Sequence, residues 1–184
     1  LKEMSLRLED YAKELNYSFI IAIANSLATP AWINSISMKF LRRLDVFLTY
    51  NLSEFECTTF DEKIFRSIWD EKLINWRINN PYNDVKIISG NKIKFLSPSV
   101  FSLFKVFSFL ENNDYTINYD KDEKKIIPNL FIGLLPEKIK SFHFKIPEII
   151  KPSPLNFLYK DISQKKLKLS HENCYFTYLD FDAY

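Results

Sequence analysis

The feature that most constrains the fold is an amphipathic segment followed at once by an apolar one. In residues 1–15, apolar side chains recur every three or four residues with charged residues between them, which predicts a helix. Residues 18–24 read SFIIAIA and predict a buried strand. Such a pair is half of a βαβ unit, so we expect a parallel neighbouring strand upstream of Leu1. Because the chain opens inside this helix, we also expect it to be a fragment.

Helical and strand patterns alternate along the rest of the chain. Pro30 is well placed to open a short helix over residues 31–41, and residues 45–50 predict the next strand. Beyond a polar stretch at 51–59, we expect helices over 60–76 and 100–110, a hairpin over 85–88 and 92–96, and strands over 115–119, 129–134, 142–146, 155–159 and 175–179. The sequence therefore predicts an α+β (mixed α/β) protein with two domains, residues 1–50 and residues 54–184.

Composition excludes several classes of function. The only two glycines, Gly90 and Gly133, are too few for a phosphate-cradling P-loop or a GxGxxG dinucleotide turn within this chain. A net charge of +2 gives no field that would favour nucleic acid. No apolar run is long enough to span a bilayer, and the charged residues 1–15 are unlike a signal peptide. With Cys57 and Cys174 far apart and no disulfide framework, we expect a cytoplasmic protein.

Residues 20–46 carry a first motif. An apolar strand ends in Asn25, Thr29 and Pro30 start a helix, and residues 41–44 lead into the next strand. This order resembles the second half of the core of GNAT-superfamily acyltransferases, of the kind associated with surface polysaccharide biosynthesis. The segment departs from the family pattern in two places, because Ala24 stands where Pro precedes the Asn, and Leu-Arg-Arg-Leu at 41–44 replaces a corner that contains Gly.

A second motif covers Trp76, Arg77 and Pro81 in the segment LINWRINNPY, and resembles the WR…NP segment that opens the second half of such proteins. The tail is similar too, with PSPLN at residues 152–156 and YFTYLDFD at residues 175–182. The blocks occur in the family's order and touch most of the chain. The resemblance implies a GNAT-like mixed twisted sheet flanked by helices, with the N-terminal part of the core truncated and a second GNAT-like domain after it.

The resemblance also implies an activity. Such proteins are N-acyltransferases that use acetyl-CoA or another acyl-CoA and act on an amine such as an amino sugar. Their CoA pyrophosphate lies on backbone N–H groups at a helix N-terminus. Here that helix would be residues 1–15, whose first turn is absent, so the acyl-CoA site is incomplete in this chain. We expect a small-molecule amine as the partner, no nucleic acid and no membrane span, and either a homo-oligomer or a missing N-terminal segment.

The cofactor-binding candidates by resemblance are Asn25, Thr29 and Pro30, and the substrate-binding candidates are Trp76 and Arg77. The Asn25 amide can both donate to and accept from pantetheine, but it can equally hydrogen-bond its own turn before Pro30. Arg77 can bind a carboxylate or phosphate in bidentate fashion. It can equally pair with the nearby carboxylate of Glu62 or Asp70. The sequence leaves both alternatives open for Asn25 and for Arg77.

No catalytic base stands out. His143 and His171 have no partners at metal-ligand spacing, so no metal site is expected. Asp180 and Asp182 would share one face of a strand, where paired carboxylates can hold a proton or cation, although a plain strand end fits equally. The serines and cysteines, namely Ser26, Ser153, Cys57 and Cys174, show no triad context. The alternative to an enzyme is a non-catalytic, degenerate GNAT-like module for binding or assembly.

Overall fold

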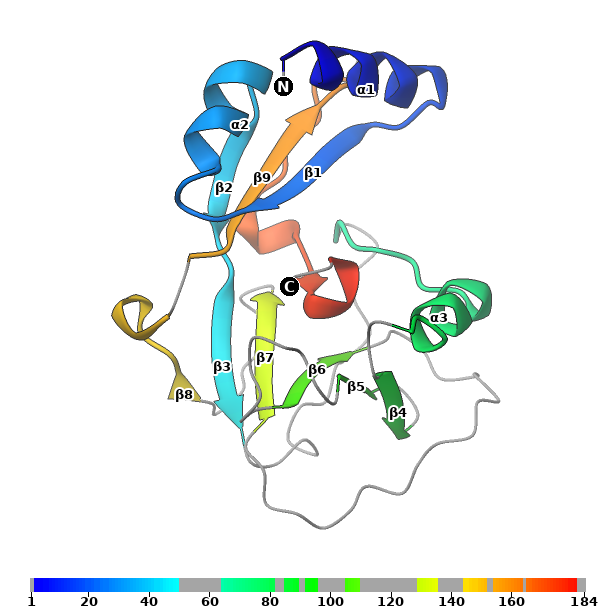
Figure 1. Cartoon of the computed structure of the whole chain (residues 1–184), viewed down its shortest axis with the longest axis vertical. Coiled ribbons are helices and arrows are strands. Elements are labelled where there is room, and N and C mark those ends of the chain that lie inside the picture. The colour runs from blue at the N-terminus through cyan, green and yellow to red at the C-terminus, as the bar shows by residue number, and fades with distance from the viewer. Residues whose placement is uncertain are drawn as a thin grey trace. The chain divides into compact units, whose positions relative to one another are not determined.

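The computed structural model describes most of the chain as two compact units (Figure 1). The described residues are 2–49, 64–81, 85–89, 92–95, 105–109, 129–135, 144–151, 154–163 and 165–181. The first unit comprises residues 1–44 and 147–171, and the second comprises residues 45–146 and 172–184. Residues 147–171, which the sequence analysis placed in the range 54–184, thus return to the N-terminal unit. Helices and two separate sheets confirm the predicted α+β class.

A three-stranded antiparallel sheet with the order β1-β9-β2 organises the first unit. Its elements are α1 (Lys2–Glu14), β1 (Phe19–Ala24), α2 (Thr29–Ile36), β2 (Lys39–Arg43), the 3-10 turn η2 (Glu148–Ile150) and β9 (Asn156–Asp161). Strand β9 comes from the second half of the chain, yet it pairs with both N-terminal strands. Among the described residues, β1 is an edge strand, and the parallel neighbour expected upstream of Leu1 stays a prediction.

Helix α2 packs its apolar side against this sheet. Ala24, Ile36, Met38 and Leu158 form a buried cluster, against which Trp32 packs. Pro30 lies in the first turn of α2, where a missing N–H costs no hydrogen bond. The helix ends earlier than the expected residue 41, because Ser37 takes a left-handed conformation (φ 59°) and β2 begins at Lys39.

Helix α1 lies over the sheet through small and charged residues. Ser5 and Ala12 are buried, and the Glu9 carboxylate contacts the ammonium groups of Lys13, at 2.9 Å, and of Lys160 on β9. Hydrogen bonds from Lys160 and then Lys13 hold the pKa of Glu9 below its usual value. The apolar stripe that defined this helix in the sequence faces solvent instead.

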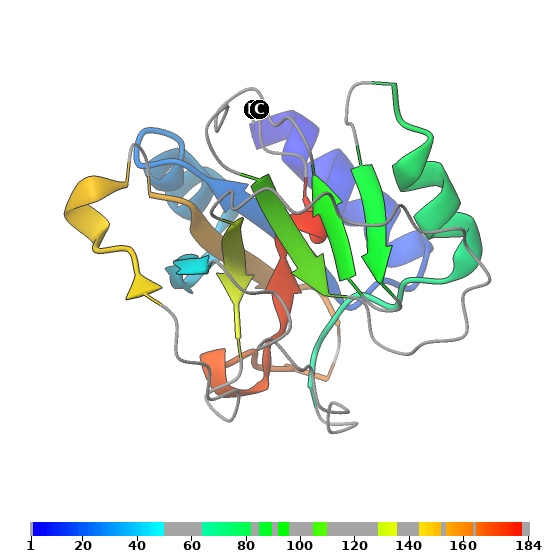
Figure 2. The ribbon, with the colours of Figure 1, turned by 90° about the horizontal axis from the view of Figure 1, so that it is seen from below.

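The second unit contains a seven-stranded sheet. Six of its strands follow the order β4-β5-β6-β7-β3-β8, and the seventh, the short strand β10, pairs with β7. Its strands are β3 (Asp45–Thr49), β4 (Val85–Ser89), β5 (Lys92–Phe95), β6 (Lys105–Phe109), β7 (Asn129–Leu134), β8 (Phe144–Lys145) and β10 (Phe176–Thr177). Helix α3 (Glu71–Ile78) and the 3-10 turn η4 (Tyr178–Asp180) complete it, and the turn η3 (His171–Asn173) leads into it. Figure 2 shows β4, β5 and β6 side by side.

Strand β7 is the centre of the second unit. Every one of its residues is buried, and it pairs parallel with β6 and antiparallel with β3 and β10. Phe107 of β6, Phe131 of β7 and Tyr175 form a buried aromatic cluster. The uninterrupted apolar pattern of residues 129–134 therefore reports a strand covered on both faces.

One predicted helix of the second unit starts later than expected, and another is replaced by a strand. The helix expected over 60–76 begins only at Glu71, because the Asp70 side chain caps it by accepting from the Leu73 N–H at 2.7 Å. Before it, residues 66–70 have no regular secondary structure, and Phe65 bridges to Cys174. The helix expected over 100–110 contains strand β6, whose residues are buried beside β7. The strands at 45–50 and 129–134 and the 85–96 hairpin are confirmed, whereas 115–119 lies outside the described residues.

Substituting Gly133 by Ala tests the packing of β10 on β7. A Cβ at this position would lie 2.0 Å from the backbone oxygen of Phe176, which is far inside van der Waals contact. We expect Gly133→Ala to lower the free energy of unfolding by about 3 kcal/mol or more. Phe144→Ala, at a side chain that is 65% exposed, should change it by less than about 1 kcal/mol. Urea denaturation measures both, and equal effects would contradict this packing.

Candidate functional site

A polar cluster lies where strand β1 ends and helix α2 begins. The Asn25 Oδ1 accepts a hydrogen bond from the Ala28 N–H at 2.8 Å, and the Thr29 hydroxyl donates to the Asn25 carbonyl at 2.7 Å. The Asn156 Nδ2 then donates to the Thr29 Oγ1 at 2.7 Å. Strand register makes this possible, because Asn156, the first residue of β9, pairs with Ala24, the last residue of β1.

The structure brings together the three cofactor-binding candidates of the first unit. Asn25 and Pro30 are exposed and Thr29 is half-buried. The Thr29 N–H also donates to the Asn25 carbonyl, at 3.0 Å, so that one carbonyl accepts two hydrogen bonds. The alternative in which Asn25 binds its own turn is therefore present for its Oδ1. Its exposed Nδ2 makes no hydrogen bond within the described part of the chain and can donate to a ligand.

Asn156 is the member of this cluster that the sequence analysis missed. The residue is 6% exposed, and its Oδ1 is buried and accepts no hydrogen bond from the residues that the structure describes. A buried acceptor left without a donor costs about 1–3 kcal/mol. The Oδ1 is thus a buried acceptor without a donor among the described residues. Asn156 ends the PSPLN block of the sequence, but its place beside Thr29 depends on the pairing of β9 with β1.

The edge of β1 adjoins this cluster. On the side away from β9, no strand pairs with β1 in the described ranges, so backbone N–H and C=O groups of Phe19–Ala24 stand along a sheet edge. Apart from Ala24, which is buried, its residues are half-buried. The cluster and the edge together offer side-chain and backbone hydrogen-bonding groups to an extended ligand.

The substrate-binding candidates lie in the second unit and point differently from each other. Trp76 is 59% exposed, whereas Arg77 is 2% exposed and its Nη2 donates to the Phe181 carbonyl at 3.0 Å. Asp70, one of the two carboxylates considered for Arg77, caps α3 instead. The other, Glu62, lies outside the described residues. Arg77 thus has a structural contact within its unit, and Trp76 is the candidate that faces solvent.

Asp180 is a buried carboxylate rather than a strand-end pair. It lies in η4, and its oxygens accept from the Thr177 N–H at 2.6 Å, the Thr177 hydroxyl at 3.1 Å and the Trp69 Nε1 at 3.0 Å. Thr177 and Asp180 form a capping box, which the T-x-x-D spacing in the sequence could have revealed. Burial raises the pKa of Asp180 despite these donors. Asp182 lies outside the described residues.

The remaining nucleophile and metal candidates give no site. Burial, and then the charge of Asp180, raise the pKa of Cys174 to about 12, so its thiol is inert at neutral pH. Among the residues that the structure covers, no three His, Cys, Asp or Glu side chains are grouped to hold a metal ion. Ser26 is exposed in the turn after β1, and His171 lies in η3. The others, namely Cys57, His143 and Ser153, are outside the described residues.

No helix among the described residues is long and apolar enough to cross a membrane. Comparison with known proteins found no match to any family model, to any curated protein or to any solved structure.

Replacing Thr29 by Val tests the polar cluster. Valine keeps the shape of threonine but removes the acceptor for the buried Asn156 Nδ2 and one donor to the Asn25 carbonyl. We expect Thr29→Val to lower the free energy of unfolding by about 1–3 kcal/mol. Ser35→Ala, at an exposed position of the same helix, should change it by less than about 0.5 kcal/mol. Urea denaturation decides, and an unchanged Thr29→Val stability would show that this network contributes nothing.

Replacing Asp180 by Asn tests the buried carboxylate. Because its folded pKa is raised above the unfolded value of about 3.9, its stabilising contribution is complete below that pH and is lost as pH rises through the folded pKa. Asp180→Asn should remove this pH dependence, and it should cost about 1–3 kcal/mol because an amide cannot accept from all three donors. Free energies of unfolding measured from about pH 4 to about pH 7 test both effects. An identical pH slope in the variant would contradict the raised pKa.

Proposed function

We propose that this chain is part of an acyl-CoA-dependent N-acyltransferase that acts on an amine such as an amino sugar. The observation that carries the proposal is the polar cluster of Asn25, Thr29 and Asn156 at the end of edge strand β1. The order helix, strand, Asn, helix, strand over residues 2–43 supports it, because that is the order that the GNAT resemblance implies. Its site would lie in a reducing, cytoplasmic setting with a small-molecule amine as partner.

The chemistry of the thioester fits these groups. Acetyl-CoA or another acyl-CoA carries a pantetheine arm whose amides each offer one N–H and one C=O. The Asn25 Nδ2 can donate to such a carbonyl, and the edge of β1 offers backbone donors and acceptors along an extended chain. A backbone N–H aimed at the thioester oxygen would stabilise the charge that develops there, while the protein holds the neutral amine against the carbonyl carbon.

A second candidate function is a non-catalytic binding or assembly module of the same architecture. Two observations favour it over catalysis. The Asn25 Oδ1 and the Arg77 Nη2 both form hydrogen bonds within their own units. Residues 41–44 also lack the glycine of the family's corner. In such a module the cluster would bind an amide-containing ligand without transferring an acyl group.

Calorimetric titration with acetyl-CoA tests the proposal on this chain and on a version extended at its N-terminus. The matched variants are Asn25→Asp, which keeps the acceptor for the Ala28 N–H but removes the Nδ2 donor, and Asn34→Asp at an exposed position of α2. We expect Asn25→Asp to weaken binding about tenfold, through one lost hydrogen bond and the added negative charge, and Asn34→Asp to leave it unchanged.

The outcomes separate the two functions. Binding together with CoA release in the presence of amino sugars supports the acyltransferase. Binding by either chain without CoA release supports the binding module. An absence of binding by both chains overturns the acyl-CoA site.

A further inference from the structure

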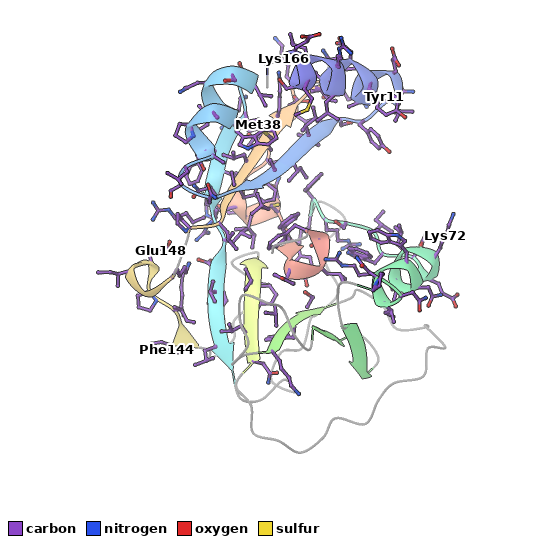
Figure 3. All side chains as sticks on the ribbon, viewed as in Figure 1. Tyr11, Met38, Lys72, Phe144, Glu148 and Lys166 are labelled. Atoms are coloured by element: carbon purple, nitrogen blue, oxygen red, sulfur yellow. The ribbon has the colours of Figure 1, made fainter. Side chains whose placement is uncertain are left out.

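An apolar stripe runs along helix α1 and one residue past its end, and it comprises Met4, Leu8, Tyr11 and Leu15. These side chains are 65%, 49%, 59% and 49% exposed, respectively. Figure 3 labels Tyr11 on this helix, at the N-terminal end of the first unit. Isolated apolar side chains on a surface need no explanation, but four in a row along one helix mark an interaction site.

The first unit does not use this stripe to hold its own helix. Ser5 and Ala12 are buried, and Glu9 forms ion pairs with Lys13 and with Lys160 of β9. These contacts hold α1 through a side of the helix other than the stripe. The stripe is therefore available to contact a partner.

The spacing of the stripe specifies the shape of that partner. Steps of four, three and four residues place the four side chains at successive d and a positions of a heptad repeat. This seam fits the groove of a second helix that crosses at about 20°. A flat sheet or an extended peptide has no matching row of holes. The partner is consequently a helix with a seam of similar pitch.

The charged residues beside the stripe indicate that the partner helix is α1 of a second copy of the chain. Arg7 and Glu14 occupy the same flanking position in consecutive heptads, have opposite charges, and are both exposed. In an antiparallel pair of identical helices, each Arg7 comes opposite the Glu14 of the other copy. In a parallel pair Arg7 would instead face Ala12, which is buried. The arrangement is self-complementary only in the antiparallel sense.

We propose that two copies of this chain associate through an antiparallel pair of α1 helices. The inference does not depend on the acyl-CoA site, because Asn25, Thr29 and Asn156 lie on other elements. A seam of two heptads is small for an interface, so a dissociation constant on the order of micromolar or weaker is expected.

Sedimentation velocity over a concentration series tests the proposal. The full chain should show a reversible equilibrium between monomer and dimer. Leu8→Asp should weaken dimerisation at least tenfold, whereas Leu6→Asp, on the same helix but off the seam and similarly exposed at 52%, should not. Circular dichroism checks that each variant keeps its helices.

Charge exchange then tests the antiparallel direction. Glu14→Arg should weaken the dimer because it places two like charges opposite each other, and Arg7→Glu combined with Glu14→Arg should restore it. A chain that stays monomeric at its highest soluble concentration overturns the proposal. So does a dimer that survives Leu8→Asp, or one that Leu6→Asp disrupts equally, because another surface would then hold the copies together.

Discussion

The pairing of β9 with both β1 and β2 is the interaction on which the first unit depends. Neither N-terminal strand has the other as a neighbour, and residues 45–146 of the second unit lie between β2 and β9 in sequence. Leu158 of β9 is fully buried in the core beneath α2. The same register places Asn156 beside Thr29, so the candidate site forms only when this long-range pairing forms. Closing such a long loop costs entropy that the core must offset.

Local sequence patterns correctly predicted the elements that depend on contacts between residues close in sequence. The Pro30 helix start and the 85–96 hairpin are of this kind. The predictions were wrong where contacts with residues distant in sequence determine the local conformation. Residues 105–109 are extended because β5 and β7 flank them, and residues 66–70 form no helix although their apolar spacing fits one. Asp70 could have been recognised as a cap, since Asp is a preferred N-cap residue.

The residues of the candidate site also differ in whether local sequence could predict them. Asn25, Thr29 and Pro30 were predictable as a group because one tight turn joins them. Asn156 was not, because a side chain 127 positions away from Thr29 becomes its neighbour only through strand register. Arg77 shows the converse case, since adjacency to Trp76 in sequence does not give the two side chains a common surface on a helix.

Helix α1 shows what hydrophobic periodicity in a sequence can predict and what it cannot. A repeat of three and four residues identifies which side chains share a face, but it does not say which face packs against the chain itself. In α1 the apolar face is exposed and the face with Ser5, Glu9 and Ala12 is internal, stabilised by small-residue packing and by the Lys160 ion pair. If two copies associate as proposed, the apolar face of α1 serves assembly, while the face with Ser5, Glu9 and Ala12 serves folding.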